Sequence, residues 1–320
     1  MPHQAFHRGE LHAQQRAGML EKMAAIGPRV IRDFMPDQHR DFFQQLPFLV
    51  VGSVDASGQP WASIISGAPG FIQSPDMHSL QVRGLHLAAQ DPLAANLHSG
   101  AKLGLLGLEP HTRRRNRANG VVQALQQGGL DIAIEQSFGN CPKYIQARKP
   151  ELQDIAALPA ATVTDSAALT PAMTEMIRRA DTFFIATALA GDDAEAHGDG
   201  HRHGADVSHR GGKPGFVRVD GDRTLTVPDF IGNSFFNTIG NLLVQPRAGL
   251  LFADFDSSAL LYLAMTAEVI WEGAEVEAFA GAQRLMRFTV QSARLLENAL
   301  PLRWGEAALS PFLEPTGAWN

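Results

Sequence analysis

The chain repeats part of its own sequence at a fixed spacing of 145 residues, and this repeat limits the possible folds more than any other feature. Asn96-Leu97 recurs as Asn241-Leu242, and the Gly-Leu-Leu that begins at Gly104 recurs at Gly249. In both halves the match spans a short helical segment followed by an apolar strand. A shared spacing in a shared context favours duplication over chance. We therefore expect two related β-domains in tandem, with ligand sites where the two halves meet.

The length and composition suit a chain with two packed cores. At 320 residues the chain exceeds the roughly 250–300 residues at which a single core stops growing. Its 45% hydrophobic and 19% charged residues are typical of a globular protein. The formal net charge of −6 argues against nucleic acid as the main partner. The one cysteine, Cys141, excludes an internal disulfide and any metal centre that needs two thiolates.

Neither a leader peptide nor a membrane span is predicted from the sequence. Residues 1–23 mix histidine, arginine and glutamate, and they lack the apolar stretch of roughly 7–15 residues that a secretory signal needs. No run of about 18 apolar residues occurs along the chain. We expect a mature cytoplasmic protein that makes no membrane contact.

Apolar runs bounded by turn residues predict a mainly β protein with flanking helices, an α+β fold. Strands are expected at residues 47–55, 61–71, 80–88, 101–109, 113–125, 181–190, 206–219 (with an internal turn), 223–230, 247–255 and 259–271. Helices are expected at residues 10–26, 36–46, 91–100, 232–245 and 275–300. The expected organisation is a helical extension (1–35), a first barrel (36–150), a helical linker (151–180) and a second barrel with a C-terminal helix (181–320).

A histidine-rich segment at residues 192–204 contains three histidines and four carboxylates. These are metal-ligand types, but ordering a glycine-containing segment around an ion would cost about 1–2 kcal/mol of backbone entropy per residue. We predict a long hairpin there and no metal site.

Four arginines fall within five positions of the strand expected at 113–125. Alternation along a strand directs Arg113, Arg115 and Arg117 to one face and Arg114 to the other. Three arginines on one face favour contact with an anion or with a partner barrel. Further along, Lys143 lies close to Cys141 and could activate the thiol, although an inert buried thiol is the commoner role.

Two segments of the second half carry groups suited to an anionic ligand. Within 206–219, glycines let the main chain approach a planar ring, while Ser208 and Arg210 could donate to carbonyls or phosphate. A plain glycine-rich turn is the alternative. Within 227–241, residues 232–234 (Gly-Asn-Ser) fall at the expected start of a helix, where free N–H groups favour an anion. Helix capping is the alternative there.

Several large enzyme classes lack their signatures in this sequence. We find no glycine-rich dinucleotide fingerprint after the first strand, no P-loop, no HExxH and no GxSxG. Rossmann enzymes, P-loop proteins, zincins and serine hydrolases are therefore not expected.

Taken together, the motifs resemble a known family. The order of PFLVVGSVDASGQPWAS, TRRRNRANG, SFGNCPKYIQAR, DVSHRGGKPGFVRV and TLTVPDFIGNSFFNTIGNLLVQPRAGLLF is similar to that of the pyridoxamine 5′-phosphate oxidase-related, FMN-binding split-barrel proteins. The resemblance is to the two-barrel members and extends over about residues 36–305. It implies two split β-barrels of the FMN-binding type in tandem, with FMN at the interface of the barrels.

The resemblance also implies which residues surround the cofactor. The flavin ring would lie near Ser208, Arg210, Phe216 and Val217, and the phosphate or ribityl chain near Asn233, Ser234 and Asn237. The predicted cofactor-binding residues are Ser208, Arg210, Phe216, Val217, Arg218, Pro228, Asp229, Asn233, Ser234, Asn237, Arg113, Arg115, Asn119 and Lys143. The family's oxidases have a Ser-Arg-Lys run where this chain has Asn-Ser-Phe-Phe at 233–236. Positive charge for the phosphate must therefore come from elsewhere, such as Arg210, Arg218 or the first-barrel arginines; the alternative is a weakened phosphate site.

The function implied by the resemblance is that of an FMN-dependent oxidoreductase acting on a small-molecule substrate, with NADH or NADPH as a candidate electron donor. No residue is predicted to act as an acid or base, since the flavin carries the redox step. The alternatives are a non-catalytic flavin- or haem-binding module and a structural duplicate without a cofactor. Association of two chains into a homodimer is compatible with the sequence.

Overall fold

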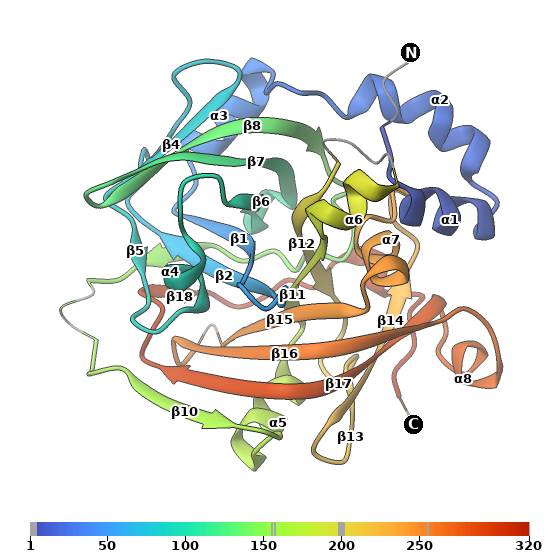
Figure 1. Cartoon of the computed structure of the whole chain (residues 1–320). Helices are drawn as coiled ribbons and strands as arrows, with labels where there is room; N and C mark the ends of the chain where they lie inside the picture. Colours follow the sequence, from blue (N-terminus) through green and yellow to red (C-terminus); the bar gives the residue numbers. More distant parts are fainter. Residues whose placement is uncertain (1–4, 155, 157, 198–201, 255, 320) are drawn as a thin grey trace.

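The protein is described here from a computed structural model that covers residues 5–154, 156, 158–197, 202–254 and 256–319 (Figure 1). Two large antiparallel sheets dominate the molecule, and helices lie around their edges. This agrees with the mainly β, α+β fold that the sequence predicts.

The first sheet contains eight strands, hydrogen-bonded in the order β3-β4-β8-β7-β6-β1-β2-β5. Its strands are β1 (Phe48–Val54), β2 (Pro60–Ser66), β3 (Ile72–Gln73), β4 (Ser79–Arg83), β5 (His86–Leu87), β6 (Lys102–Glu109), β7 (Arg114–Gln126) and β8 (Gly129–Gly139). The inner face is apolar and includes Leu49, Val51 and Leu105. Strand β8 is absent from the predicted set, although Leu130, Ile132 and Ile134 alternate with other residues along it.

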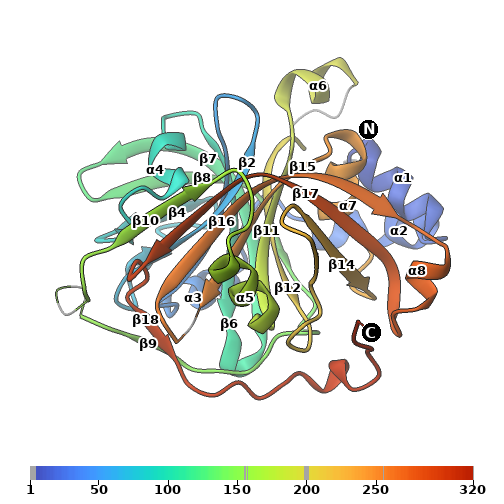
Figure 2. The same cartoon turned by 90° about the horizontal axis from the view of Figure 1, so that it is seen from below.

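The second sheet has the order β12-β11-β15-β16-β17-β14-β13, and β10 adds to β17. Its strands are β10 (Thr162–Ser166), β11 (Thr182–Leu189), β12 (Gly204–Gly211), β13 (Arg218–Asp220), β14 (Thr224–Phe230), β15 (Arg247–Asp254), β16 (Ala259–Ile270) and β17 (Ala282–Glu297). Strands β9 (Pro150–Leu152) and β18 (Leu302–Trp304) form a separate pair. Figure 2 shows β10 running beside β17.

The two sheets have the same topology, which confirms the duplication. Strands β4-β8-β7-β6-β1-β2 correspond in order to β14-β17-β16-β15-β11-β12. The register corresponds as well, since Val50 pairs with Leu106 and Phe184 pairs with Leu251. Leu106 and Leu251 are partners in the 145-residue repeat.

The repeated glycines mark the surface where the barrels meet. A Cβ on Gly104 would lie 2.6 Å from the carbonyl oxygen of Ala205, and one on Gly249 would lie 2.7 Å from the Cα of Trp61. Strand β6 therefore packs directly on β12, and β15 packs on β2. A further apolar core, separate from the cores inside the two barrels, includes Val50 and Leu251 and fills the space between the sheets. The Gly-Leu-Leu repeat thus encodes the interface between the barrels.

Eight helices accompany the sheets in the described residues. They are α1 (Arg8–Arg16), α2 (Leu20–Val30), α3 (Asp37–Gln44), α4 (Pro92–Asn96), α5 (Pro171–Arg179), α6 (Gly191–Ala196), α7 (Asn237–Val244) and α8 (Ala274–Glu277). The predicted helix at 36–46 is confirmed, and α4 begins where expected but ends at Asn96. Asp91 caps α4 by accepting a hydrogen bond from the backbone N–H of Leu93 at 2.8 Å.

The single helix predicted at 10–26 is wrong, because α1 and α2 are separate helices. Gly18 has φ +68°, a left-handed conformation that ends α1 and that glycine adopts at little cost. The N–H of Met19 donates to the carbonyl of Gln14 at 2.8 Å and closes the turn. We call residues 8–30 the N-terminal hairpin, which lies beside α7 (Figure 1).

The C-terminal helix predicted at 275–300 is also wrong. Apart from the short α8, this segment forms the 16-residue strand β17. Met286, Phe288 and Val290 are buried at alternate positions, and a bulge near Gln291 then shifts the alternation to Ala293 and the half-buried Leu295. The bulge breaks the two-residue period, so the apolar residues also fall at helix-like spacings.

The linker predicted as helical at 151–180 contains one helix, α5, the strand β10 and most of the short strand β9. Thr162 and Val163 suit a strand because β-branched side chains favour extended backbone. Among the described residues, no helix is long and apolar enough to cross a membrane.

Candidate functional site

A cavity of about 590 Å³ lies where the two barrels meet the N-terminal hairpin. Strands β7 and β12 form one end, and the loop before α7 with the hairpin forms the other. Its polar and aromatic lining includes Arg16, Lys22, Arg115, Arg117, Asn140, Cys141, Ser208, His209, Arg210, Asp229, Asn233, Ser234, Phe236, Asn237, Thr238, Trp271, Glu272 and Arg284. The volume is in the range of cofactor and small-molecule sites.

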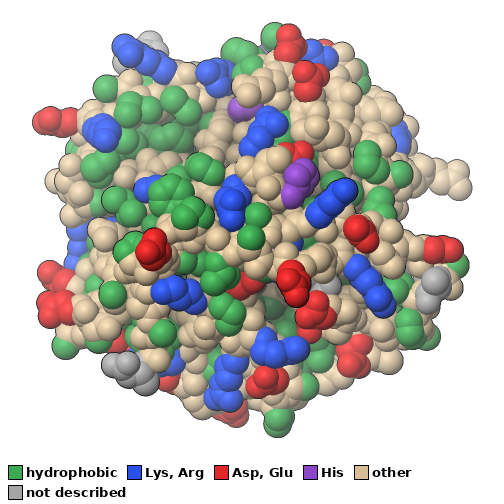
Figure 3. All heavy atoms as spheres, turned by 180° about the vertical axis from the view of Figure 1, so that it is seen from behind, with side chains coloured by type: hydrophobic (Ala, Val, Ile, Leu, Met, Phe, Trp, Pro, Cys, Tyr) green, Lys and Arg blue, Asp and Glu red, His purple; other side chains and the backbone are tan. Residues whose placement is uncertain are grey.

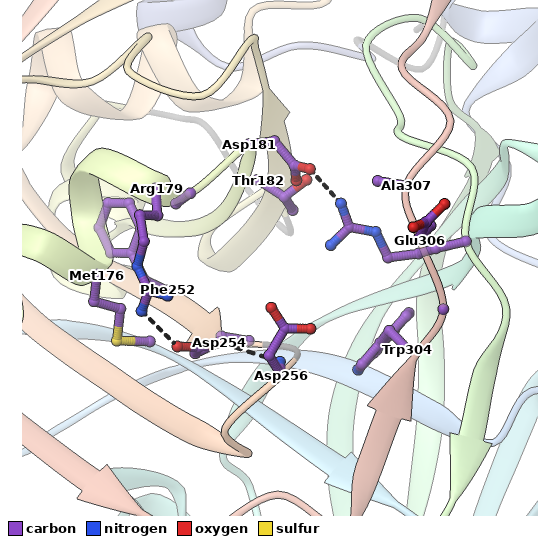
Figure 4. A pocket seen from close by; sticks show the side chains of 14 residues that line it. Met176, Arg179, Asp181, Thr182, Phe252, Asp254, Asp256, Trp304, Glu306 and Ala307 are labelled. Atoms are coloured by element: carbon purple, nitrogen blue, oxygen red, sulfur yellow. Dashed lines mark hydrogen bonds and ion pairs between the residues drawn. The ribbon is translucent and has the colours of Figure 1, made fainter.

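The cavity is strongly basic. Six lysine or arginine side chains line it, against two carboxylates, Asp229 and Glu272. Another pocket, of about 430 Å³, is different because its arginines are matched (Figure 4). There Arg148 is bound to Asp181, and Arg179 is bound to Asp254 at 3.0 Å. The excess of positive charge therefore distinguishes the interface cavity.

Arg115 contributes a half-buried positive charge to the cavity. Its Nε donates to the carbonyl of Cys141 at 2.6 Å, and Nη1 donates to the carbonyl of His209 at 3.2 Å. No carboxylate pairs with Arg115 among the residues that the structure describes. Burial lowers the pKa of Arg115 to about 10, so the guanidinium stays charged at neutral pH. Burial, with Arg115 and Arg210 nearby, holds the pKa of His209 well below its ordinary value, so that ring is neutral.

Arg117 is bound across the barrel interface. It is 1% exposed, it pairs with Asp206 of β12, and its Nη2 donates to the carbonyl of Val207 at 2.8 Å and to Ser208 Oγ at 2.5 Å. Asn119 and the repeat-partner residue Asn241 also donate to Asp206, at 2.7 and 3.0 Å. The arginines of this strand are expected to contact either an anion or the partner barrel, and Arg117 contacts the partner barrel.

Arg210 and Arg284 share one carboxylate further along the cavity. The Arg284 Nη1 is 3.1 Å from Asp229 Oδ2, and the Arg210 Nη2 is 3.5 Å from Asp229 Oδ1. The group of two guanidinium ions and one carboxylate therefore has a net positive charge. Arg284 also lies over the ring of Trp271, at 4.8 Å from its centroid.

Several buried donors on the cavity wall lack a hydrogen-bond partner within the described part of the chain. They are Nε of Arg117, Arg210 and Arg284, Nδ2 of Asn140 and Nε1 of Trp271. An unsatisfied buried donor costs about 1–3 kcal/mol, so such atoms are uncommon in folded proteins. All five atoms belong to residues that line the cavity.

The helix predicted at 232–245 begins later than expected. Ser234 and Phe236 both have left-handed backbone, with φ of 64° and 63°, so residues 232–236 form a bent loop and α7 starts at Asn237. The loop still lines the cavity. The Oδ1 of Asn233 accepts from the N–H of Phe235 at 3.1 Å, which is the capping-type role considered as its alternative.

Half of the fourteen predicted cofactor-binding residues line the cavity. These are Ser208, Arg210, Asp229, Asn233, Ser234, Asn237 and Arg115. The other seven lie outside its lining: Phe216, Val217, Arg218, Pro228, Arg113, Asn119 and Lys143.

Packing explains the residues that lie elsewhere. Phe216 and Val217 are in the core of the second barrel, where Phe216 stacks on Phe183. Arg218 pairs with Asp220 and Glu275. Pro228 lies within β14 and pairs with Leu285.

Two basic residues of the first barrel also point away from the cavity. Arg113 precedes β7 in left-handed backbone and donates to the carbonyl of Ile145 at 3.0 Å. It therefore does not share the strand face of Arg115 and Arg117 as predicted. Lys143 lies 5.2 Å from the ring centroid of Phe312.

The histidine-rich segment falls partly outside the described residues, since 198–201 are not described. Where a long hairpin is predicted, residues 191–196 form the short helix α6. No group of three or more histidine, cysteine or carboxylate side chains with metal-binding geometry is found in the part of the chain that is described.

The second copy of the interface has different chemistry. The 145-residue spacing relates Arg117 to Tyr262 and Ser208 to Ser63. Both counterparts contact Asp91: the Tyr262 hydroxyl donates to Oδ2 at 2.6 Å, and the Ser63 hydroxyl donates to Oδ1 at 2.5 Å. A neutral phenol thus stands where the first copy has a guanidinium, and the basic cavity occurs at one copy of the interface.

Asp91 should make stability depend on pH. Burial raises its pKa to about 6, so the folded state binds the proton more tightly than the unfolded state. Stability from this group is complete below about pH 4 and is lost as the pH rises to about 6, by about 3 kcal/mol. Denaturant titrations of the wild type and Asp91→Asn should show the wild type losing stability relative to the variant between about pH 4 and about pH 7. A constant difference would contradict this assignment.

Charges of both signs are interspersed on the face seen in Figure 3. Lysine and arginine side chains alternate there with aspartate and glutamate, so no field of one sign covers this face.

Comparison with known proteins supports the resemblance for the first half of the chain. Residues 35–164, which include the whole first sheet, match the sequence model of the pyridoxamine 5′-phosphate oxidase family. This confirms the resemblance to the split-barrel family that the motifs indicate. No curated protein matches the chain.

Three solved structures resemble the chain distantly. HupZ of Group A Streptococcus is 17% identical, over 39% of this chain and 97% of its own, with a TM-score of 0.30. A Lactobacillus delbrueckii protein, provisionally assigned as a pyridoxamine 5′-phosphate oxidase, is 13% identical over 40% and 94%, with a TM-score of 0.31. The K. pneumonia MrkH–c-di-GMP complex is 8% identical over 82% and 87%, with a TM-score of 0.22. These likenesses are too distant to bear on activity.

Proposed function

We propose that the interface cavity binds FMN and that the protein is an FMN-dependent oxidoreductase. The observation that carries the proposal is Arg115, a half-buried guanidinium without a carboxylate partner among the described residues, in a cavity with six basic and two acidic side chains. FMN supplies the anionic phosphate and the carbonyl acceptors that such a wall requires. The family match over residues 35–164 supports the same cofactor.

The residues divide the cavity into two ends. Alternation places Asp206, Ser208 and Arg210 on one face of β12, and the neighbouring β7 presents Arg115. This end suits the flavin ring, and the loop at 232–236 suits the phosphate. FMN bound here would supply the redox chemistry of its flavin ring, hydride acceptance and electron transfer. Arg115 would hold the ring edge and stabilise negative charge that develops there, while His209 stays neutral behind it.

Flavin titrations of the wild type and Arg115→Ala test the proposal. The wild type should bind FMN with a change in the visible flavin spectrum. Arg115→Ala should weaken both FMN and riboflavin by roughly tenfold to a hundredfold, since a hydrogen bond from a charged group is worth about 1.5–3 kcal/mol. Arg179→Ala is the matched control, because Arg179 is paired with Asp254 in the other pocket.

Two outcomes separate binding from catalysis. A wild-type protein that binds neither flavin overturns the proposal. A bound flavin that neither NADH nor NADPH reduces, and that passes electrons to no acceptor tested, would instead indicate the non-catalytic flavin-binding module.

A further inference from the structure

The N-terminal hairpin forms one wall of the interface cavity. Arg16, Ala17, Met19 and Lys22, at and around its turn, all line the cavity. The hairpin lies outside residues 35–164, which match the family model, and outside the residues predicted to bind the cofactor. The basic side chains Arg16 and Lys22 therefore reach the cavity from a segment with no assigned role.

The hairpin is fixed against α7 by close and specific contacts. A Cβ on Gly240 would lie 2.6 Å from the backbone nitrogen of Glu10, so α1 and α7 touch through their main chains. The Glu10 carboxylate accepts a hydrogen bond from Asn237 Nδ2 at the first turn of α7. Gln14 Nε2 donates to the carbonyl of Phe235 at 3.3 Å. The hairpin thus docks on the loop and helix expected to face the phosphate.

Arg16 has little charge compensation from the protein. Its nearest carboxylate, Glu272, is 3.8 Å away, and that side chain is 90% exposed, so water and salt screen the pair. The Arg16 guanidinium lies over the ring of Trp271, at 4.7 Å from its centroid, and Arg284 lies at 4.8 Å from the same ring. Arg16 and Arg284 therefore gather positive charge at this end of the cavity.

A phosphate bound at the loop before α7 would need basic side chains from another element. Residues 233–236 are Asn-Ser-Phe-Phe and carry no basic side chain. We infer that the N-terminal hairpin supplies the missing charge, with Arg16 and Lys22 binding the phosphate of FMN. This inference rests on the proposed function and assigns the hairpin a part in cofactor selection.

Comparing FMN with riboflavin, which lacks the phosphate, tests the inference. The wild type should prefer FMN. Arg16→Ala/Lys22→Ala should bind FMN roughly tenfold or more weakly and bind riboflavin as the wild type does. Arg29→Ala is the control, because Arg29 is an exposed basic residue of the same hairpin that does not line the cavity.

A backbone variant tests the docking separately. In Gly9→Val the new side chain would meet Val244 and the backbone of Gly240, which should displace α1 and reduce the preference for FMN in the same way. If the double variant keeps the wild-type preference for FMN, the inference is overturned while the proposed function stands. If the wild type binds neither flavin, the proposed function itself fails. Equal loss of FMN and riboflavin binding in the double variant would also contradict a phosphate role.

Discussion

Replacing Arg117 with methionine should lower the free energy of unfolding by about 3–5 kcal/mol, a large effect for a single substitution. Arg117 is fully buried and pairs with Asp206 across the interface between the barrels. Removing the guanidinium leaves the half-buried Asp206 carboxylate with, among the described residues, only the amide donors of Asn119 and Asn241. Denaturant titration of the two proteins measures the difference.

An exposed ion pair provides the control for Arg117. Arg179→Met removes the pair with Asp254, but the Arg179 side chain is 58% exposed, so a loss of less than about 1 kcal/mol is expected. The double variant Arg117→Met/Asp206→Asn should recover part of the lost stability, because it removes the isolated charge. Equal effects of Arg117→Met and Arg179→Met would contradict a structural role for the buried pair.

Gly249→Ala should destabilise the protein by about 1–3 kcal/mol or more, because the added methyl group overlaps the backbone at Pro60 and Trp61. Gly104→Ala should have a similar effect, since its Cβ would meet Ala205 and Asp206 at the equivalent contact. Thermal and denaturant unfolding measure both.

Gly305 offers a matched control for the interface glycines. A Cβ there has no neighbour within 4 Å, and Gly305→Ala should leave stability nearly unchanged. If Gly249→Ala were equally harmless, the barrels would not be packed through their main chains at this point.

Sequence reasoning recovers the part of this fold that depends on local patterns and on the repeat. The Gly-Leu-Leu repeat predicts the duplication because the same close contact is required at both copies of the interface. The turn at Gly18 and the bulge in β17 are harder to predict. A glycine inside a helical pattern is often tolerated, and a bulge that shifts alternation mimics helical spacing. Tertiary pairing of β17 with β14 and β16 decides its conformation.

The candidate site was harder to predict because its residues come from distant segments. Alternation along β7 groups Arg115 with Arg117, and the alternation of β12 groups Ser208 with Arg210. No local pattern brings Arg284 into the cavity, since its segment is assigned to a helix from sequence. Arg16 and Lys22 depend on how the hairpin docks on α7, which is a property of the folded chain.

Crystals grown with FMN test the central claim most directly. We predict electron density for the flavin ring between β7 and β12, within hydrogen-bonding distance of Arg115, with the phosphate toward the loop at 232–236. Flavin density in the pocket beside Arg148, or no flavin density at saturating FMN, would contradict the assignment of the interface cavity as the cofactor site.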